Sequence, residues 1–483
     1  MSFKIAATAP NRAGRTPRAA HARRNEIARR RLSRTMPTLA GKSPARSRSK
    51  SPTTKSRSKS RVAKSKSPLP SSTFILRLTQ AIVIIDYCAV GAMRTVLPYY
   101  AKELGAKGAD IGGLETVYGI GQIVGSLFFG WLSDARGRKT VLLLSFLGAA
   151  IGYSFASLAV AIGSVTLLLL SRLPVGLAKQ TVTATRAVVS DLTPPDAGRS
   201  EALAKLFAGC SIGYAVGPYV GGLLADSAST GGANWLPALI CASVFVALIP
   251  IVTILLPETS GAAPVRNGAV KPAAAKSKNR GPQRQREWLL LLGCTLPEGA
   301  LVMFSSTALA LLAQSFGWPA SQLGLYNSLW GVASGACSLT LWPWLLGSGR
   351  LSDVTALHTG SMSLGVASAL VAWRRTPFVL WAILPLGVIA VGMIRTIPAA
   401  LLTKNAPAAA RGQVLGRLDA AGSLVRVLLP TAAGALSDRF GVWSAFGAQA
   451  VLCAGGLAIV ELWRQGGWKK KQKRERDQGE VNV

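Results

Sequence analysis

The chain has 483 residues, of which 49% are hydrophobic and 16% charged, and its net charge is +35. Soluble domains average about 25% charged residues, so this composition argues against an ordinary soluble domain, while the positive charge suggests an anionic surface or nucleic acid as a partner. Two distant histidines, His21 and His358, and six isolated cysteines argue against an enzyme, a metal site, a cofactor or a disulfide framework and predict buried free thiols.

Residues 1–73 form a basic tail with 20 lysines and arginines against one acid, Glu26. Its segment "SPARSRSKSPTTKSRSKSRVAKSKSP" (43–68) is of low complexity, which predicts disorder. Three interpretations stay open. The tail could bind anionic lipid headgroups, bind nucleic acid, or contain an organelle transit peptide within the arginine-rich residues 1–40.

Apolar runs long enough to cross a bilayer, which needs about 20 residues per helix, recur twelve times after the tail. They are rich in glycine and alanine and lack a polar stripe, as is typical of helices packed in lipid. The predicted spans are 75–100, 111–133, 140–160, 163–190, 200–226, 234–256, 288–314, 322–347, 355–373, 377–403, 411–437 and 441–463. A charged linker at 257–287 divides the chain into six-helix halves at 74–256 and 288–463, and a basic tail follows at 464–483.

Basic residues concentrate in the breaks before the odd-numbered spans and after the last span. By the positive-inside rule both termini are predicted to be cytoplasmic. We expect a multi-pass monomer in a plasma membrane or endomembrane, with a plastid or mitochondrial membrane as the alternative.

The two halves are related by an internal repeat. A shift of 212 residues pairs "GPYVGGLLAD" with "LPTAAGALSD", and so pairs Pro218 with Pro430 and Asp226 with Asp438. In another register "GWLSD" (130–134) pairs with "GRLSD" (349–353). Parallel repeats of this kind are found in secondary transporters, which hold their substrate between the halves near the middle of the membrane.

Four motifs make the chain resemble the major facilitator superfamily over roughly residues 74–463. The first lies in the turn between spans 2 and 3 and matches the family pattern at Gly130, Leu132, Asp134, Gly137, Arg138 and Lys139, with Ala135 in place of the usual arginine. The span-4 motif matches at Arg172 and Gly176. The span-5 antiporter motif matches at Gly209, Gly213, Gly217, Pro218, Gly221 and Gly222, and "LPET" (256–259) resembles a common end of span 6.

Within the superfamily, the stretch "DYCAVGAMRTVLP" resembles span 1 of tetracycline-resistance-type and multidrug proton antiporters. "DLTPPDAGRSEALAKL" resembles their eukaryotic organic-cation-transporter-like relatives. The resemblance implies an all-α membrane protein with twelve helices in two parallel halves. It also implies transport of a small organic solute, cationic or amphipathic, in exchange for protons.

The resemblance further implies that the turn between spans 2 and 3 holds the two halves together in one state of the transport cycle. Asp134 would face the N-terminus of span 11 near Arg411, where the helix dipole stabilises a carboxylate. Arg138 would reach Asp191. Gly130 would permit close approach of two helices and Gly137 the tight turn. The alternative is a plain topology signal.

Ionisable residues inside the predicted spans are candidates for proton and substrate sites, because such residues are costly in a membrane. The candidates are Asp86, Arg94, Glu115, Arg172, Lys179, Arg186, Glu298, Arg395, Asp419 and Arg426. We expect Asp86 to carry the proton, with Arg172 as its partner; a purely structural ion pair is the alternative. The glycines from 209 to 222 and Pro218 are expected to let span 5 pack closely and bend.

We therefore predict a secondary transporter that works by alternating access, with proton-coupled antiport as the favoured mechanism. A nutrient symporter or uniporter is the second possibility. A rival of another class is a transport-inactive scaffold whose tail binds nucleic acid or lipid.

Overall fold

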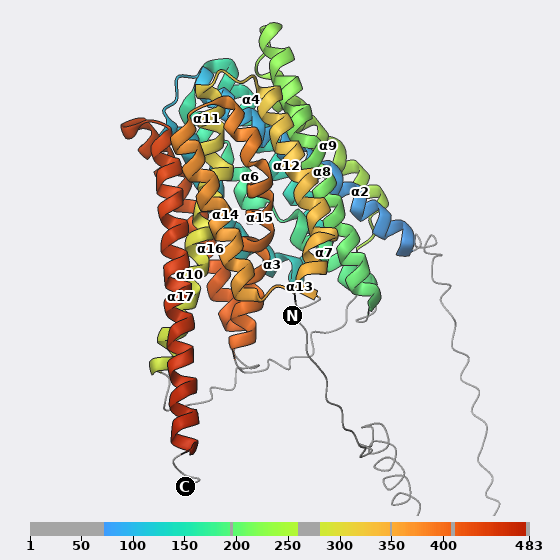
Figure 1. Ribbon diagram of the computed structural model, residues 1–483. Coiled ribbons are helices and arrows are strands. Elements are labelled where there is room, and N and C mark those ends of the chain that lie inside the picture. Colours follow the sequence, from blue (N-terminus) through green and yellow to red (C-terminus); the bar gives the residue numbers. More distant parts are fainter. Residues whose placement is uncertain (1–71, 194–196, 259–280, 348–349, 407–410, 480–483) are drawn as a thin grey trace, which may run out of the picture. The chain divides into compact units, whose positions relative to one another are not determined.

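The computed structural model describes residues 72–193, 197–258, 281–347, 350–406 and 411–479. The basic tail, most of the predicted linker and the last four residues lie outside these ranges. Within them the chain is built from helices that run alongside one another (Figure 1).

The first half contains five long helices and one interrupted span. The long helices are α2 (Ser72–Glu103), α3 (Gly108–Arg136), α4 (Arg138–Ile162), α8 (Ala197–Thr230) and α9 (Leu236–Leu255). The predicted fourth span is divided into α5 (Val165–Leu170), α6 (Arg172–Ala178) and α7 (Thr181–Leu192).

The second half begins with α10 (Gly281–Met303), which continues through a π-helical turn, η1 (Phe304–Ala308), into α11 (Leu309–Ser315). The remaining helices are α12 (Ala320–Leu339), α13 (Leu341–Gly347), α14 (Asp353–Arg374), α15 (Pro377–Asn405), α16 (Arg411–Phe440) and α17 (Trp443–Gly479). The helix α10 starts before the predicted residue 288, and α17 continues well past the predicted residue 463.

Ten helical segments of the described ranges are long and apolar enough to cross a membrane. The other two predicted spans correspond to α3 and to the series α5–α7. The helix α3 has 29 residues, but many of them are glycine, which lowers its hydropathy. The pieces of the fourth span are individually too short to cross a bilayer.

Proline explains the first interruption of the fourth span. Pro174 has no backbone N–H and therefore cannot donate to the carbonyl of Leu170, and the helix breaks at Ser171. The second break lies at Lys179 and Gln180, where the N–H of Gln180 donates to the carbonyl of Ala178 (2.8 Å) and to Ser145 Oγ (3.1 Å). A continuous helix over 163–190 was therefore a wrong prediction.

Each half has its own apolar core. In the first half Phe245 packs against Phe146 and Tyr153, with ring centroids 6.0 and 5.6 Å apart. In the second half Phe304 packs against Trp330 and Phe446, with centroids 5.1 and 5.9 Å apart. Four of the six cysteines are buried as predicted, whereas Cys88 and Cys337 are partly exposed.

The glycine motif of span 5 is packed between two helices. Gly213, Gly217 and Gly221 lie against the backbone of α2, and a side chain on Gly217 would meet the carbonyl of Cys88. Gly222 faces the other way, against the backbone of α12 at Ala320. Pro218 sits inside α8, next to Gly91 of α2. Small residues thus bring α8 close to helices of both halves.

Candidate functional site

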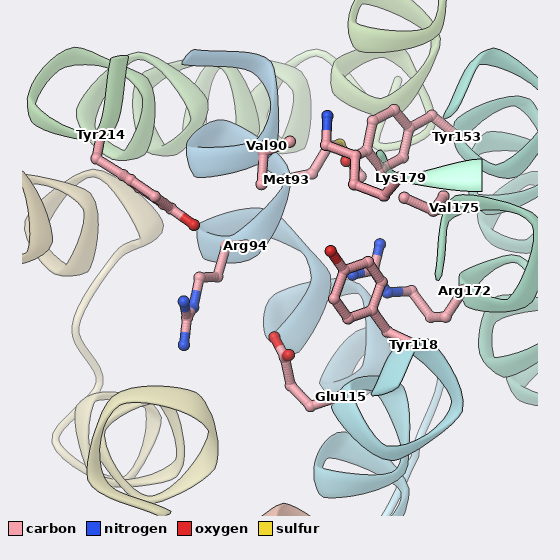
Figure 2. Close-up of a pocket in the computed structure, with 10 residues that line it drawn as sticks. All are labelled: Val90, Met93, Arg94, Glu115, Tyr118, Tyr153, Arg172, Val175, Lys179 and Tyr214. Carbon is pink, nitrogen blue, oxygen red and sulfur yellow. The ribbon is translucent and has the colours of Figure 1, made fainter. Parts of the chain in front are cut away.

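A cavity of about 400 Å³, part of it open to solvent, lies among the helices of the first half (Figure 2). Its walls combine three kinds of side chain: charged, tyrosine and apolar. They come from α2, α3, α4, α6, α8 and the break after α6. The lining residues are Val90, Met93, Arg94, Glu115, Tyr118, Tyr153, Arg172, Val175, Lys179 and Tyr214.

Asp86 of α2 is fully buried beside this cavity. Its Oδ1 accepts hydrogen bonds from Lys179 Nζ, with which it forms an ion pair, and from Thr181 Oγ1 at 3.3 Å. Its Oδ2 has no hydrogen-bond partner among the described residues. The expected partner Arg172 was wrong, because Lys179 occupies that position.

The break in span 4 explains why Lys179 reaches Asp86. Lys179 ends α6 with φ −70° and ψ 79°, so the chain leaves the helical path at this residue. Its ammonium group also lies 5.1 Å from the centroid of the Phe245 ring. The sequence showed Lys179 as a charge inside a span, but helical periodicity could not reveal the break that directs it toward Asp86.

Arg172 lies on α6 and is only 7% exposed. Its guanidinium carbon is 5.1 Å from the centroid of the Tyr118 ring (Figure 2). The close approach of α6 to α3 depends on Gly176, since a Cβ there would collide with the backbone carbonyl of Tyr118. The span-4 motif thus places its arginine on a tyrosine of α3.

Arg94 and Glu115 both line the cavity, as Figure 2 shows. Arg94 NH2 donates to the carbonyl oxygen of Ser305 at 3.2 Å. Ser305 lies in η1 of the second half, and π-helical turns are frequent at functional sites. Arg94 therefore links the cavity to the opposite half of the protein.

The predicted charged residues of the second half do not line this cavity. Arg426 NH1 lies 3.4 Å from Glu298 Oε1, and these two form an ion pair. Arg395 and Asp419 are exposed, and no ion pair within the described ranges includes either. The structure thus brings together the candidates of the first half and separates them from those of the second.

The turn between α3 and α4 has the backbone conformation that the motif predicts. Gly137 has φ 94°, which favours glycine. Arg138 Nε lies 3.5 Å from Asp191 Oδ2, the predicted contact. The N–H of Arg138 also donates to Glu258 Oε1 at 2.8 Å, and Lys139 Nζ donates to the carbonyl of Thr253 at 2.7 Å. The turn is therefore attached to the end of α9, which the sequence did not indicate.

Two predictions for the same turn have other outcomes. No atom would lie within 4 Å of a Cβ on Gly130, so the expected close helix approach at Gly130 was wrong. The side chain of Asp134 lies outside what the structure describes, as does that of Arg411, and the expected contact near the N-terminus of span 11 stays a prediction.

Two carboxylates connect the halves at the ends of α8 and α16. Asp226 accepts hydrogen bonds from the N–H groups of Ala320 and Ser321, both at 2.9 Å. Asp438 accepts hydrogen bonds from the N–H groups of Gly108 and Ala109, at 2.7 and 2.8 Å. Both pairs of donors begin a helix, α12 and α3, in the half opposite to the carboxylate.

Membrane-spanning helices in two repeated halves, with charged side chains around a cavity, define an α-helical multi-pass membrane transporter. The model of the Major Facilitator Superfamily matches residues 81–416 and 291–481. The chain therefore belongs to the major facilitator superfamily, as its motifs predicted.

Known relatives agree with this membership. The chain is similar to human solute carrier family 67 member A1, with 27% identity over 84% of this chain and 96% of that protein. Over 148 residues it is 30% identical to the class H tetracycline resistance protein of Pasteurella multocida, which covers 30% of this chain and 36% of that one. The crystal structure of the nucleoside transporter NupG matches with a TM-score of 0.66 and 15% identity over 81% of this chain and 99% of that chain.

Proposed function

We propose that this protein transports a small organic solute by proton-coupled alternating access and that Asp86 binds the proton. The observation that carries the proposal is the buried Asp86 carboxylate, in which one oxygen is paired with Lys179 and the other has no described partner. A free oxygen on a buried carboxylate offers a place for a proton, and Lys179 supplies a charge that can compensate when the proton leaves.

The direction of coupling has two candidates. The similarity to the tetracycline resistance protein supports antiport, in which a cationic or amphipathic solute would compete with the proton for Asp86. The ion pair with Lys179 supports symport instead. Protonation of Asp86 would release the positive charge of Lys179, so that a proton and a negatively charged solute would bind together.

Alternating access would use the contacts at the two ends of the helices. The carboxylates of Asp226 and Asp438 would hold the halves together at the external end. The turn after α3, with Asp134, Arg138, Lys139 and Asp191, would do so at the cytoplasmic end in the opposite state. Breaking one set while forming the other would expose the cavity to each side in turn.

Reconstituted protein in liposomes tests this function directly. Solutes from a broad panel are added to vesicles containing a pH-sensitive dye, and proton movement that depends on the solute is recorded. Movement of protons opposite to the solute establishes antiport, and movement together establishes symport. Solute uptake without proton movement would contradict proton coupling and favour a uniporter.

The tail gives the proposal its rival and its location. With both termini cytoplasmic, residues 1–73 would lie against anionic headgroups, each nearby basic residue contributing about 1 kcal/mol. The plasma membrane or an endomembrane is the favoured site for this monomer, and a plastid or mitochondrial membrane is the alternative. Absence of transport for the whole panel, together with tail-dependent binding of nucleic acid, would favour a scaffold.

A further inference from the structure

Arg172 is a buried positive charge with an unmet need for a negative partner. The Nε and NH1 atoms have no hydrogen-bond partner in the described part of the chain, and the residue is 7% exposed. Its one recorded interaction is with the Tyr118 ring. A cation–π contact contributes about 0.5–2 kcal/mol, whereas removing a charge from water costs several kcal/mol even after relaxation. The ring alone therefore does not compensate the buried charge.

The nearby carboxylates leave this need unmet. Asp86 is paired with Lys179 and Thr181. Glu115 lines the same cavity, yet it forms no ion pair with Arg172 within the ranges that the structure describes. Arg94 spends a hydrogen bond on a neutral carbonyl, that of Ser305. Three cations thus face two carboxylates, and Arg172 is the cation left without a charged partner.

The rest of the cavity wall suits an apolar body attached to such a charge. Tyr118, Tyr153 and Tyr214 offer ring faces and hydroxyl groups, and Val90, Met93 and Val175 are apolar (Figure 2). A volume of about 400 Å³ falls within the roughly 300–1,000 Å³ that is typical of small-molecule sites.

We propose that the cavity binds an organic anion, a carboxylate, sulfonate or phosphate ester with an aromatic or apolar body, and that its negative group pairs with Arg172. This inference rests on the proposed transport function and names the solute class. Guanidinium and carboxylate or phosphate groups form two parallel hydrogen bonds, and the two unpartnered nitrogens of Arg172 are suited to this. An anion would not compete with a proton for Asp86, so this assignment favours symport over antiport.

Binding to purified full-length protein in nanodiscs tests the solute class without requiring proton coupling. The probes are aromatic carboxylates, sulfonates and phosphate monoesters, each with the amide and the amine of the same carbon skeleton. We expect anions to raise the Tm of the wild type and their amides and amines to do so less. Stabilisation by amines alone, or by no anion, would overturn the assignment.

Substitution of Arg172 locates the site. Arg172→Gln should weaken binding of the stabilising anion by about 30-fold or more, and Arg172→Lys should weaken it less. The control is Arg186→Gln, because Arg186 lies on α7 over the Phe207 ring and is exposed, so anion binding should stay at the wild-type level. Equal anion binding by Arg172→Gln and wild type would refute the proposal.

The stability of Arg172→Gln without any probe separates a binding role from a structural one. Removing an unpaired buried charge should leave the Tm of the empty protein unchanged or higher. A marked fall in that Tm would show that Arg172 stabilises the fold and would contradict the inference. If protons still move with a neutral or cationic solute, the anion assignment fails while the transporter function stands.

Discussion

Asp226 and Asp438 occupy equivalent positions in the two sequence repeats, and each carboxylate binds the first N–H groups of a helix in the opposite half. The helix N-terminus carries a partial positive charge, which adds to the two hydrogen bonds. The repeat therefore produces two equivalent connections between the halves, one to α12 and one to α3.

Neutralising these carboxylates should open this end of the protein. Each connection is worth about 1 kcal/mol or more, roughly a factor of 5 in the ratio of closed to open states. Spin labels at Thr230→Cys and Thr376→Cys, in a background without Cys88 and Cys337, should report a longer distance in Asp226→Asn/Asp438→Asn. Glu103→Gln is the control, because Glu103 bonds Asn234 within its own half. An unchanged distance in the double variant would show that these contacts do not control opening.

The ion pair of Asp86 and Lys179 makes a second prediction, about stability. Lys179→Met leaves a buried carboxylate uncompensated, which costs about 3–5 kcal/mol, so the Tm should fall. Asp86→Asn/Lys179→Met removes both charges and should recover most of that loss. Lys205→Met should have little effect, because its partner Glu201 is as exposed as Lys205 itself. Additive losses in the double variant would argue against a direct pair.

Coupling to protons gives a third prediction. Asp86→Asn imitates the protonated carboxylate permanently, so it should abolish uphill, proton-driven transport and leave downhill exchange measurable. The measurement is solute accumulation in vesicles over a series of pH gradients, compared with exchange without a gradient. Accumulation by this variant would make Asp86 structural and pass the proton role to Glu115, Glu298 or Asp419.

The turn after α3 gives a fourth prediction. Asp134→Asn should lower the transport rate more than solute affinity, because it shifts the balance between states without touching the cavity. Asp353, its equivalent in the repeat, contacts Lys404 of its own half, so Asp353→Asn should have the smaller effect. Equal transport by Asp134→Asn and wild type at equal expression would reduce the turn to a topology signal.

Orientation in the membrane gives the last prediction. A membrane-impermeant thiol reagent added outside intact cells should label Thr230→Cys, while Val270→Cys and Glu480→Cys should react only after permeabilisation. This pattern follows from the distribution of basic residues among the loops. External labelling at 270 would rule out the arrangement of two six-helix halves joined by a cytoplasmic linker.

The sequence by itself determined the class of this protein. The need to satisfy every backbone group within the bilayer makes long apolar helices the local solution, so composition alone located most of the helices and divided the chain into halves. Motifs and repeats added the superfamily, the positive φ of Gly137 and the equivalence of Asp226 and Asp438. These features depend on short stretches of chain, and such stretches can be interpreted without knowing their neighbours.

The tertiary structure alone decided which charges meet. Three cations in span 4, Arg172, Lys179 and Arg186, could each have paired with Asp86, and the break after α6 selected Lys179. The same packing left Arg172 on Tyr118 and placed Glu258 against the turn at Arg138. Partner choice depends on helix breaks and interhelical packing between residues far apart in the chain, and hydropathy carries no information about either.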